Sequence, residues 1–333
     1  MMHRWLVCAI LFALGAGSAT AFARQTHTAS SASAAQPAAT PQPPKTYHLQ
    51  RHPVVALTFD DLPAAGSLPP GDNRVRILTT LTEELKAHHL KGVYGFVNAV
   101  SLPGDQDAQQ ALRIWLAAGM NIGSHTWDHP SLTDNTAAFF EHDIALNEPL
   151  LAQFAGNRDW HWFRFPYLEE GDTLAKRNDV RAWLQSHGYR VAQVTLNFDD
   201  DSWNDPYARC MARHDTAAIA WLKQSYLENA AEFLRVGREE ELTAFGHEVP
   251  NVLLLHGTAF TTLMLPDLLK ILHQQGFRFA SLPKVESNPI YFQNVNAALK
   301  NGGSLPNQYL DSRNLPYPPL TQEPYDKLHN LCR

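Results

Sequence analysis

Cysteine is scarce in this chain, with three residues among 333. Cys8 lies in an apolar stretch near the N-terminus, so only Cys210 and Cys332 remain if that stretch is removed on export. Two cysteines allow one intramolecular pair, and an oxidising compartment favours its formation. We therefore expect a disulfide between Cys210 and Cys332, with two free thiols as the alternative.

The chain also lacks a basic block and a long apolar run. Its formal net charge is −6, which gives no attraction to nucleic acid. The N-terminal apolar run is about twelve residues long, too short to cross a bilayer comfortably. It follows Arg4 and precedes Ala21 and Ala23, the layout of a secretory signal. We expect residues 1–23 to be a signal peptide and the mature protein to be periplasmic or secreted, without a membrane span. The oligomeric state stays open.

Large apolar residues are absent from residue 24 until Tyr47. Residues 24–50 are instead rich in Ala, Ser, Pro and Gln, a composition typical of a flexible linker. Residues 51–285 have the composition of a folded domain, and residues 286–333 show little periodicity. We expect this last segment to be an irregular tail packed on the domain.

Within the domain, apolar segments of strand length alternate with amphipathic segments of helix length. Strands are predicted at 53–59, 92–97, 120–124, 162–165, 189–198, 251–255 and 277–281. Helices are predicted at 72–90 (with Asp72 as N-cap), 107–119, 134–154, 177–188 and 261–276. Residues 206–248 are predicted to be a helical insertion, in which the helical stretch 206–245 contains two or more helices. This alternation predicts an α/β fold, specifically a distorted (β/α) barrel of about seven parallel strands.

Polar residues follow the predicted strands directly. Asp60 and Asp61 close the first strand, His125 and His129 follow the third, and His256 follows "NVLLL". The carboxyl ends of parallel strands share one face of such a barrel, which is where active sites are built. We therefore expect these side chains to meet.

A metal site accounts for three of these residues. Asp61, His125 and His129 supply one carboxylate and two imidazoles, and such a set leaves positions open for water and substrate. Zinc is the first choice, although the same donors accept cobalt, nickel or manganese. Asp60 is then free to act as a general base towards a metal-activated water.

Five ordered motifs in the chain resemble those of the polysaccharide deacetylase family, the NodB-type domain of carbohydrate esterase family 4. They are "TFDD" (58–61), "HTWDH" (125–129), "RFPY" (164–167), an acidic stretch ending in Trp203, and "LLH" (254–256). The resemblance spans residues 53 to about 283, and it implies a NodB-like barrel.

The resemblance also implies a role for each matching residue. Asp60 is the general base, and Arg164 holds it ionised by a charged hydrogen bond. Tyr167 lends its backbone N–H to the oxyanion. His256 is the general acid that protonates the leaving group, and Leu254 lines the pocket for the acetyl methyl. Asp61, His125 and His129 bind the metal.

The sequence departs from the family pattern at two places. Leu62 stands where the family usually has Gly after the paired aspartates, so we expect a differently shaped loop that narrows or redirects the groove. The fourth motif reads "NFDDDSW". Asp200 best matches the acid that supports the catalytic His, with Asp199 and Asp201 as alternatives, and Trp203 is expected to provide an aromatic substrate surface.

The sequence thus predicts a metal-dependent hydrolase that removes acetyl groups from an N- or O-acetylated saccharide. Two alternatives remain open. The altered residues are compatible with a catalytically impaired carbohydrate-binding protein, and the same scaffold is compatible with hydrolysis of a non-sugar amide. The sequence does not identify the saccharide, because its subsites are formed by loop side chains.

Overall fold

A computed structural model describes residues 49–299, 301–321 and 324–333 of the chain. The expected signal peptide (1–23) and most of the expected linker lie outside the described residues. Among the described residues, no helix combines the length and apolar character needed to cross a membrane.

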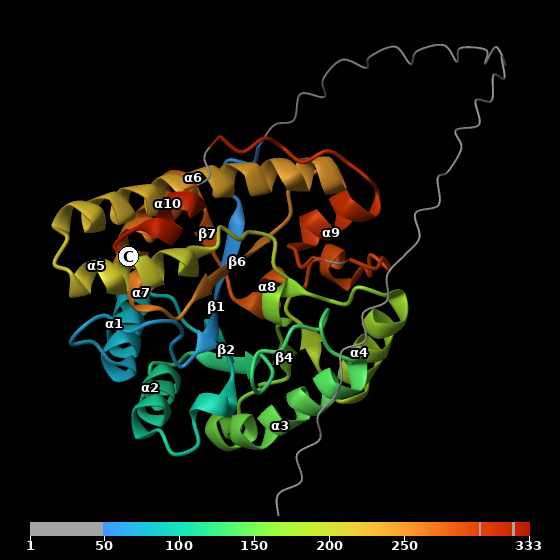
Figure 1. The fold of residues 1–333 in the computed structure, drawn as a ribbon. Coiled ribbons are helices and arrows are strands. Elements are labelled where there is room, and N and C mark those ends of the chain that lie inside the picture. Colours follow the sequence, from blue (N-terminus) through green and yellow to red (C-terminus); the bar gives the residue numbers. More distant parts are fainter. Residues whose placement is uncertain (1–48, 300, 322–323) are drawn as a thin grey trace, which may run out of the picture. The chain divides into compact units, whose positions relative to one another are not determined.

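Seven parallel strands form the central sheet, as predicted (Figure 1). They are β1 (Val54–Leu62), β2 (Tyr94–Val97), β3 (Asn121–Ser124), β4 (Trp162–Phe163), β5 (Arg190–Val191), β6 (Asn251–His256) and β7 (Arg278–Phe279). The order is β5-β4-β3-β2-β1-β6, and β7 pairs with the start of β1. An isolated parallel bridge joins Leu196, beyond β5, to Leu253 in β6. Because this bridge links the chain beyond β5 to β6, and β5 and β6 stand at opposite ends of the order, the sheet curls into a distorted half-barrel.

The predicted strand at 189–198 is wrong as one continuous element. Its first residues pair with β4, and the ladder ends where Ala192 N–H donates to the Phe163 carbonyl at 2.7 Å. Further along, Leu196 N–H donates to the Val252 carbonyl at 3.0 Å. The segment crosses from β4 to β6, so it cannot remain in register with one neighbour.

Helices alternate with the strands and continue after the last strand. They are α1 (Arg74–Ala87), α2 (Gln106–Ala117), α3 (Ala137–Ala155), α4 (Leu174–Ser186), α5 (Asn204–Ala212), α6 (Thr216–Phe245), α7 (Ala259–Gln274), α8 (Leu282–Val285), α9 (Leu305–Ser312) and α10 (Tyr325–Asn330).

One helix boundary corrects the prediction. Asn73, not Asp72, caps α1, because its side chain accepts from Arg76 N–H. The insertion contains more than one helix, as predicted: it is divided into α5 and α6 at His214, which has a positive φ, and Asp215 then caps the new helix.

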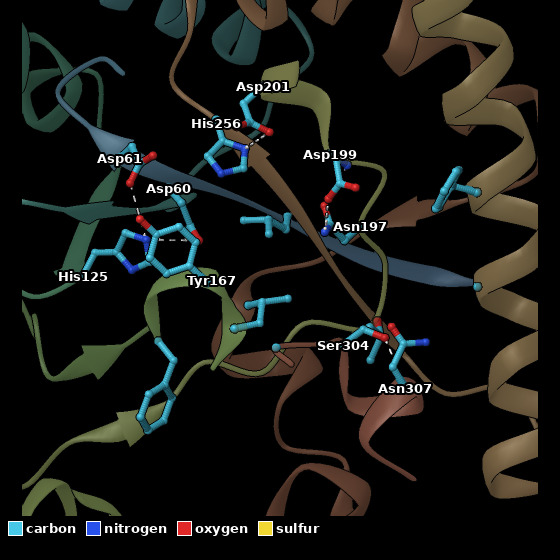
Figure 2. A pocket seen from close by; sticks show the side chains of 18 of the residues that line it. Asp60, Asp61, His125, Tyr167, Asn197, Asp199, Asp201, His256, Ser304 and Asn307 are labelled. Atoms are coloured by element: carbon cyan, nitrogen blue, oxygen red, sulfur yellow. Dashed lines mark hydrogen bonds and ion pairs between the residues drawn. The ribbon is translucent and has the colours of Figure 1, made fainter. Parts of the chain in front are cut away.

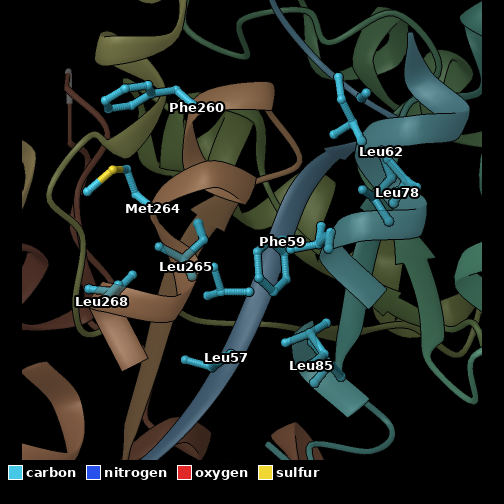
Figure 3. Packing of buried hydrophobic residues seen from close by; sticks show 14 of the residues in the cluster. Leu57, Phe59, Leu62, Leu78, Leu85, Phe260, Met264, Leu265 and Leu268 are labelled. Carbon is cyan, nitrogen blue, oxygen red and sulfur yellow. The ribbon is translucent and has the colours of Figure 1, made fainter. Parts of the chain in front are cut away.

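The largest hydrophobic core lies between β1 and the helices on its outer side. Figure 3 shows Phe59 of β1 between Leu78 of α1 and Leu265 of α7. Leu62, at the end of the same strand, is 1% exposed and belongs to this core. The core therefore anchors β1 up to the residues that directly follow Asp60 and Asp61.

The C-terminal segment was expected to be irregular, but it contains α9 and α10. Leu305 and Leu310 of α9 pack against Ala244 and Val249 near the end of α6. The expected disulfide between Cys210 and Cys332 is present, with a Cα–Cα distance of 5.2 Å. It fastens the segment after α10 to α5.

Candidate active site

Most of the predicted site residues line one cavity of about 630 Å³. Asp60 and Asp61 enter it from the end of β1, and His256 enters from the end of β6. Asp60 and His256 are register partners in the two neighbouring strands. Figure 2 shows His125 and Tyr167 on the same side of the cavity as Asp61.

Three side chains form a group that fits a metal ion. Asp61 Oδ1 lies 3.5 Å from His125 Nε2 and 3.6 Å from His129 Nε2, and the three ligand atoms lie within 4.8 Å of one another. Asp61 Oδ1 is buried and has no hydrogen-bond partner. A buried carboxylate oxygen without a partner is costly, and a cation bound by the three residues would satisfy it. The residues present therefore fit a divalent metal.

The backbone fixes the ring of His125 in the orientation that a ligand needs. Its Nδ1 lies 2.8 Å from the Arg164 carbonyl, which can only accept, so Nδ1 carries the proton. Nε2 is then left with its lone pair facing Asp61. Burial, assisted by the neighbouring His129, lowers the pKa of His125 to about 3. The imidazole is neutral at physiological pH, as metal binding requires.

The loops that present these ligands adopt uncommon backbone conformations. Asp61, Thr126 and His129 have φ values of 61°, 67° and 53°, in the left-handed region that side chains other than Gly rarely occupy. Such conformations persist where the surroundings enforce them, and they gather at functional sites.

Sequence analysis missed the residue that holds this loop in place. Asp143 Oδ1 accepts from Trp127 N–H at 2.7 Å and from Asp128 N–H at 3.1 Å. Asp143 is 5% exposed and lies on the buried face of α3, next to Ile144. An acid among the apolar positions of a helix was the available signal.

Asp60 and Arg164 form a buried ion pair beside the ligands. Arg164 Nη1 lies 3.2 Å from both Asp60 oxygens, and its Nε donates to the Ala192 carbonyl at 2.7 Å. Its Nη2 donates to Thr58 Oγ1 at 3.1 Å, and the guanidinium lies over the Phe96 ring. Burial raises the pKa of the Asp60 carboxyl, and the Arg164 charge acts against that rise.

Asp200 is the acid that contacts His256. Asp200 Oδ1 lies 2.8 Å from His256 Nδ1, and its Oδ2 accepts from His256 N–H at 3.0 Å. Asp201 is farther from the ring, at 3.7 Å. Asp199 instead accepts from Asn197 Nδ2 and from the Tyr325 hydroxyl. Burial alone would lower the pKa of His256, but the carboxylates of Asp201 and Asp200 raise it well above its ordinary value.

Tyr167 and Leu254 both line the cavity. Tyr167 has a φ of 56° and is 60% exposed. Its ring stands edge-on to the His129 ring, with 4.5 Å between the ring centroids. Leu254 is buried at the base of the cavity in β6.

The expectation for Trp203 was wrong. Trp203 is 0% exposed, and its Nε1 donates to Ser225 Oγ at 2.9 Å. Its ring packs edge-on against Tyr226 and Tyr325. Because no part of the ring reaches the cavity, it offers no surface to a substrate.

Leu62 does not itself line the cavity, because its side chain points into the core. Its methyl groups occupy space above two glycines. A Cβ on Gly95 would lie 2.1 Å from Leu62 Cδ1, and a Cβ on Gly257 would lie 2.6 Å from Leu62 Cδ2. The side chain fits between the two neighbouring segments.

Sequence analysis also missed the far wall of the cavity. Phe233 and Glu240 of α6 line it, together with Gly302, Ser304 and Asn307 of the C-terminal segment. No local signal links these two segments to the site, because their position depends on tertiary packing.

Comparisons with known proteins agree with the motif pattern. Residues 49–192 match the family model of polysaccharide deacetylases. The fold is similar to chitin deacetylase from the fungus Colletotrichum lindemuthianum (21% identity, 72% of this chain and 90% of that chain, TM-score 0.49). It is also similar to peptidoglycan deacetylase from Bacillus subtilis (19%, 71% and 90%, TM-score 0.46) and to a carbohydrate esterase family 4 pseudoenzyme from Bacillus anthracis (14%, 70% and 65%, TM-score 0.48).

Proposed function

Because residues 49–192 match the family model of polysaccharide deacetylases, we propose that the protein is a metal-dependent hydrolase that removes acetyl groups from an N- or O-acetylated saccharide. The observation that carries this proposal is the partnerless, buried Asp61 Oδ1 facing two imidazoles. Asp60, which is paired with Arg164, lines the same cavity. His256, which is paired with Asp200, lines it as well.

Asp61, His125 and His129 hold the metal in this proposal, with zinc as the first choice. A divalent cation there supplies a Lewis acid for the acetyl carbonyl and lowers the pKa of a water molecule. The protein keeps the donors in the required state, because the Arg164 carbonyl fixes the tautomer of His125.

Asp60 takes the proton from the attacking water. Arg164 holds the carboxylate by two contacts of 3.2 Å, which favours the ionised form and fixes its direction. The backbone N–H of Tyr167 donates to the oxyanion that develops on the acetyl oxygen. The attack forms a C–O bond to the acetyl carbon.

His256 completes the reaction by giving a proton to the leaving nitrogen or oxygen. The carbon–heteroatom bond then breaks, which yields acetate and an amine or alcohol. The carboxylates of Asp201 and Asp200 keep the imidazole protonated before this step, as the raised pKa of His256 indicates. Leu254 gives the acetyl methyl an apolar contact.

The charge of the cavity favours an uncharged sugar. Among the described residues that line it are five acids, and none is Lys or Arg. The acids are Asp60, Asp61, Asp199, Asp201 and Glu240. Two of them are engaged by the metal and by Arg164, so the remainder of the lining is acidic. A substrate that carries a carboxylate would be repelled there.

We also propose that the protein is exported. The N-terminal apolar run and the Cys210–Cys332 disulfide support this, because disulfides persist in oxidising compartments.

Acetate release tests the function. The purified protein is incubated with acetylated chitooligosaccharides, acetylated xylan and a small cyclic amide, with zinc and after chelation. We expect zinc-dependent acetate from a saccharide. His125→Ala should remove most of the bound zinc, whereas Asp60→Asn should keep the zinc and lower the rate by orders of magnitude. Saccharide binding without acetate release from any compound would contradict the proposal.

A further inference from the structure

The catalytic cavity is walled at the end away from the metal group. Figure 2 shows Ser304 and Asn307 across the cavity from Asp61 and His125, with the long helix α6 beside them. These wall segments, α6 and residues 302–307, lie outside residues 49–192, the part matched by the family model. The wall is therefore built by the parts of the chain that follow the matched region.

The C-terminal part of this wall is fixed against the catalytic loop. A Cβ on Gly302 would lie 1.7 Å from the Tyr167 carbonyl oxygen, so the two backbones are in direct contact at this point. Leu305 N–H donates to the Val194 carbonyl at 2.6 Å. Gln308 Nε2 donates to Glu170 Oε1 at 2.8 Å, and both residues are buried. The wall is part of the packed structure.

The inner surface of the wall carries hydrogen-bonding groups. Glu240 and Asn307 line the cavity next to each other, and Ser304 caps α9 beside them. Burial raises the pKa of Glu240 to about 7. A carboxyl group in that range accepts or donates, and an amide and a hydroxyl do both. Adjacent groups of this kind match the hydroxyls of a sugar ring.

We propose that this end of the cavity is a closed subsite that binds one terminal sugar unit through Glu240 and Asn307. The enzyme would then act on short saccharides or on chain ends, and not on internal units of a polymer. The inference rests on the proposed function, and it specifies the substrate further. The cavity volume of about 630 Å³ is typical of small-molecule pockets. A polymer with sugar units on both sides of the reacting acetyl group would collide with α6 or with residues 302–307.

The test uses N-acetylglucosamine oligomers of increasing length, from the monomer to the hexamer, with the full-length, zinc-loaded protein. Affinity is measured by calorimetry with the Asp60→Asn protein, and acetate release with the wild type. Mass spectrometric sequencing locates the free amine in the product. We expect affinity and kcat/KM to stop rising after the first two or three units, and the amine to lie at one chain end.

Glu240→Gln and Asn307→Ala should each raise KM for the N-acetylglucosamine dimer about tenfold with little change in kcat. Each change removes or weakens a hydrogen bond that holds the sugar equally in the ground state and in the transition state. Glu239→Gln is the matched control. Glu239 lies one position earlier on α6 and pairs with Arg235 outside the cavity, so its change should leave KM unaltered.

The outcomes separate the two proposals. If no oligomer releases acetate, the proposed function fails, and the calorimetry still decides the closed subsite. Affinity that increases with every added sugar unit up to the hexamer, or free amines at scattered positions along the product, would overturn the proposal of a closed subsite. Equal KM changes in the Glu239→Gln and Glu240→Gln proteins would also overturn it.

Discussion

Breaking the Cys210–Cys332 bridge should lower the melting temperature without disturbing the active site. The disulfide joins residues 122 positions apart. The chain-entropy model assigns about 5 kcal/mol to the closure of a loop of that length. For about 280 folded residues, an unfolding entropy of about 2.1 cal/mol/K per residue converts this into a fall in Tm of about 8 °C.

The native contacts indicate that this effect arises mainly in the unfolded chain. Arg209 Nη2 donates to the carbonyls of Leu328 and Leu331 at 3.1 and 3.0 Å, and the Lys327 ammonium lies over the Trp221 ring. Leu328 is buried against the main core. These contacts keep α10 in place when the bridge is absent, so acetate release at 25 °C should be preserved.

Scanning calorimetry of Cys332→Ser, Cys210→Ala and the double variant measures the effect. Because either single change breaks the bridge, all three variants should lose the same amount of stability. An unchanged Tm, or a double variant that loses the sum of the single losses, would refute the reasoning. A drop in zinc content would show that the tail supports the metal site directly.

Three further predictions concern individual side chains. Asp200→Asn removes one of the carboxylates that raise the pKa of His256, so the imidazole should lose its proton at a lower pH. The alkaline limb of the profile of kcat against pH should therefore move down by about one pH unit. An unmoved limb would assign the support of His256 to Asp201 alone. Trp203→Phe removes the hydrogen bond to Ser225 and should lower the free energy of unfolding in urea by about 1–2 kcal/mol, while KM stays constant. A large rise in KM would restore Trp203 as a substrate contact. Leu62→Ala leaves a cavity between Gly95 and Gly257 and should cost about 2–5 kcal/mol with zinc affinity unchanged; weaker zinc binding at full stability would contradict the core placement.

The sequence predicted the centre of the site well for a physical reason. Asp60, Asp61 and His256 directly follow apolar strands, and parallel strands bring their carboxyl ends to one face. The sheet therefore determines the approximate position of each side chain. The same logic predicted a barrel of about seven parallel strands.

Long-range packing determined what the sequence could not predict. Trp203 and Asp200 are three positions apart in one short helical turn, yet Trp203 packs in the core and Asp200 contacts His256, and the local sequence does not distinguish these two environments. Asp72 and Asn73 are both good N-caps, and the start of α1 decided between them. The far wall depends on α6 and on residues 302–307, neither of which belongs to a motif.

Arg164 acts on the site through its main chain and its side chain together. Its carbonyl fixes the ring of His125, and its guanidinium holds Asp60. A small displacement of the chain after β4 would carry both groups in the same direction. The 3.8 Å spacing between the His125 imidazole and the Asp60 carboxylate is thereby less sensitive to thermal motion of the barrel than the position of either group alone.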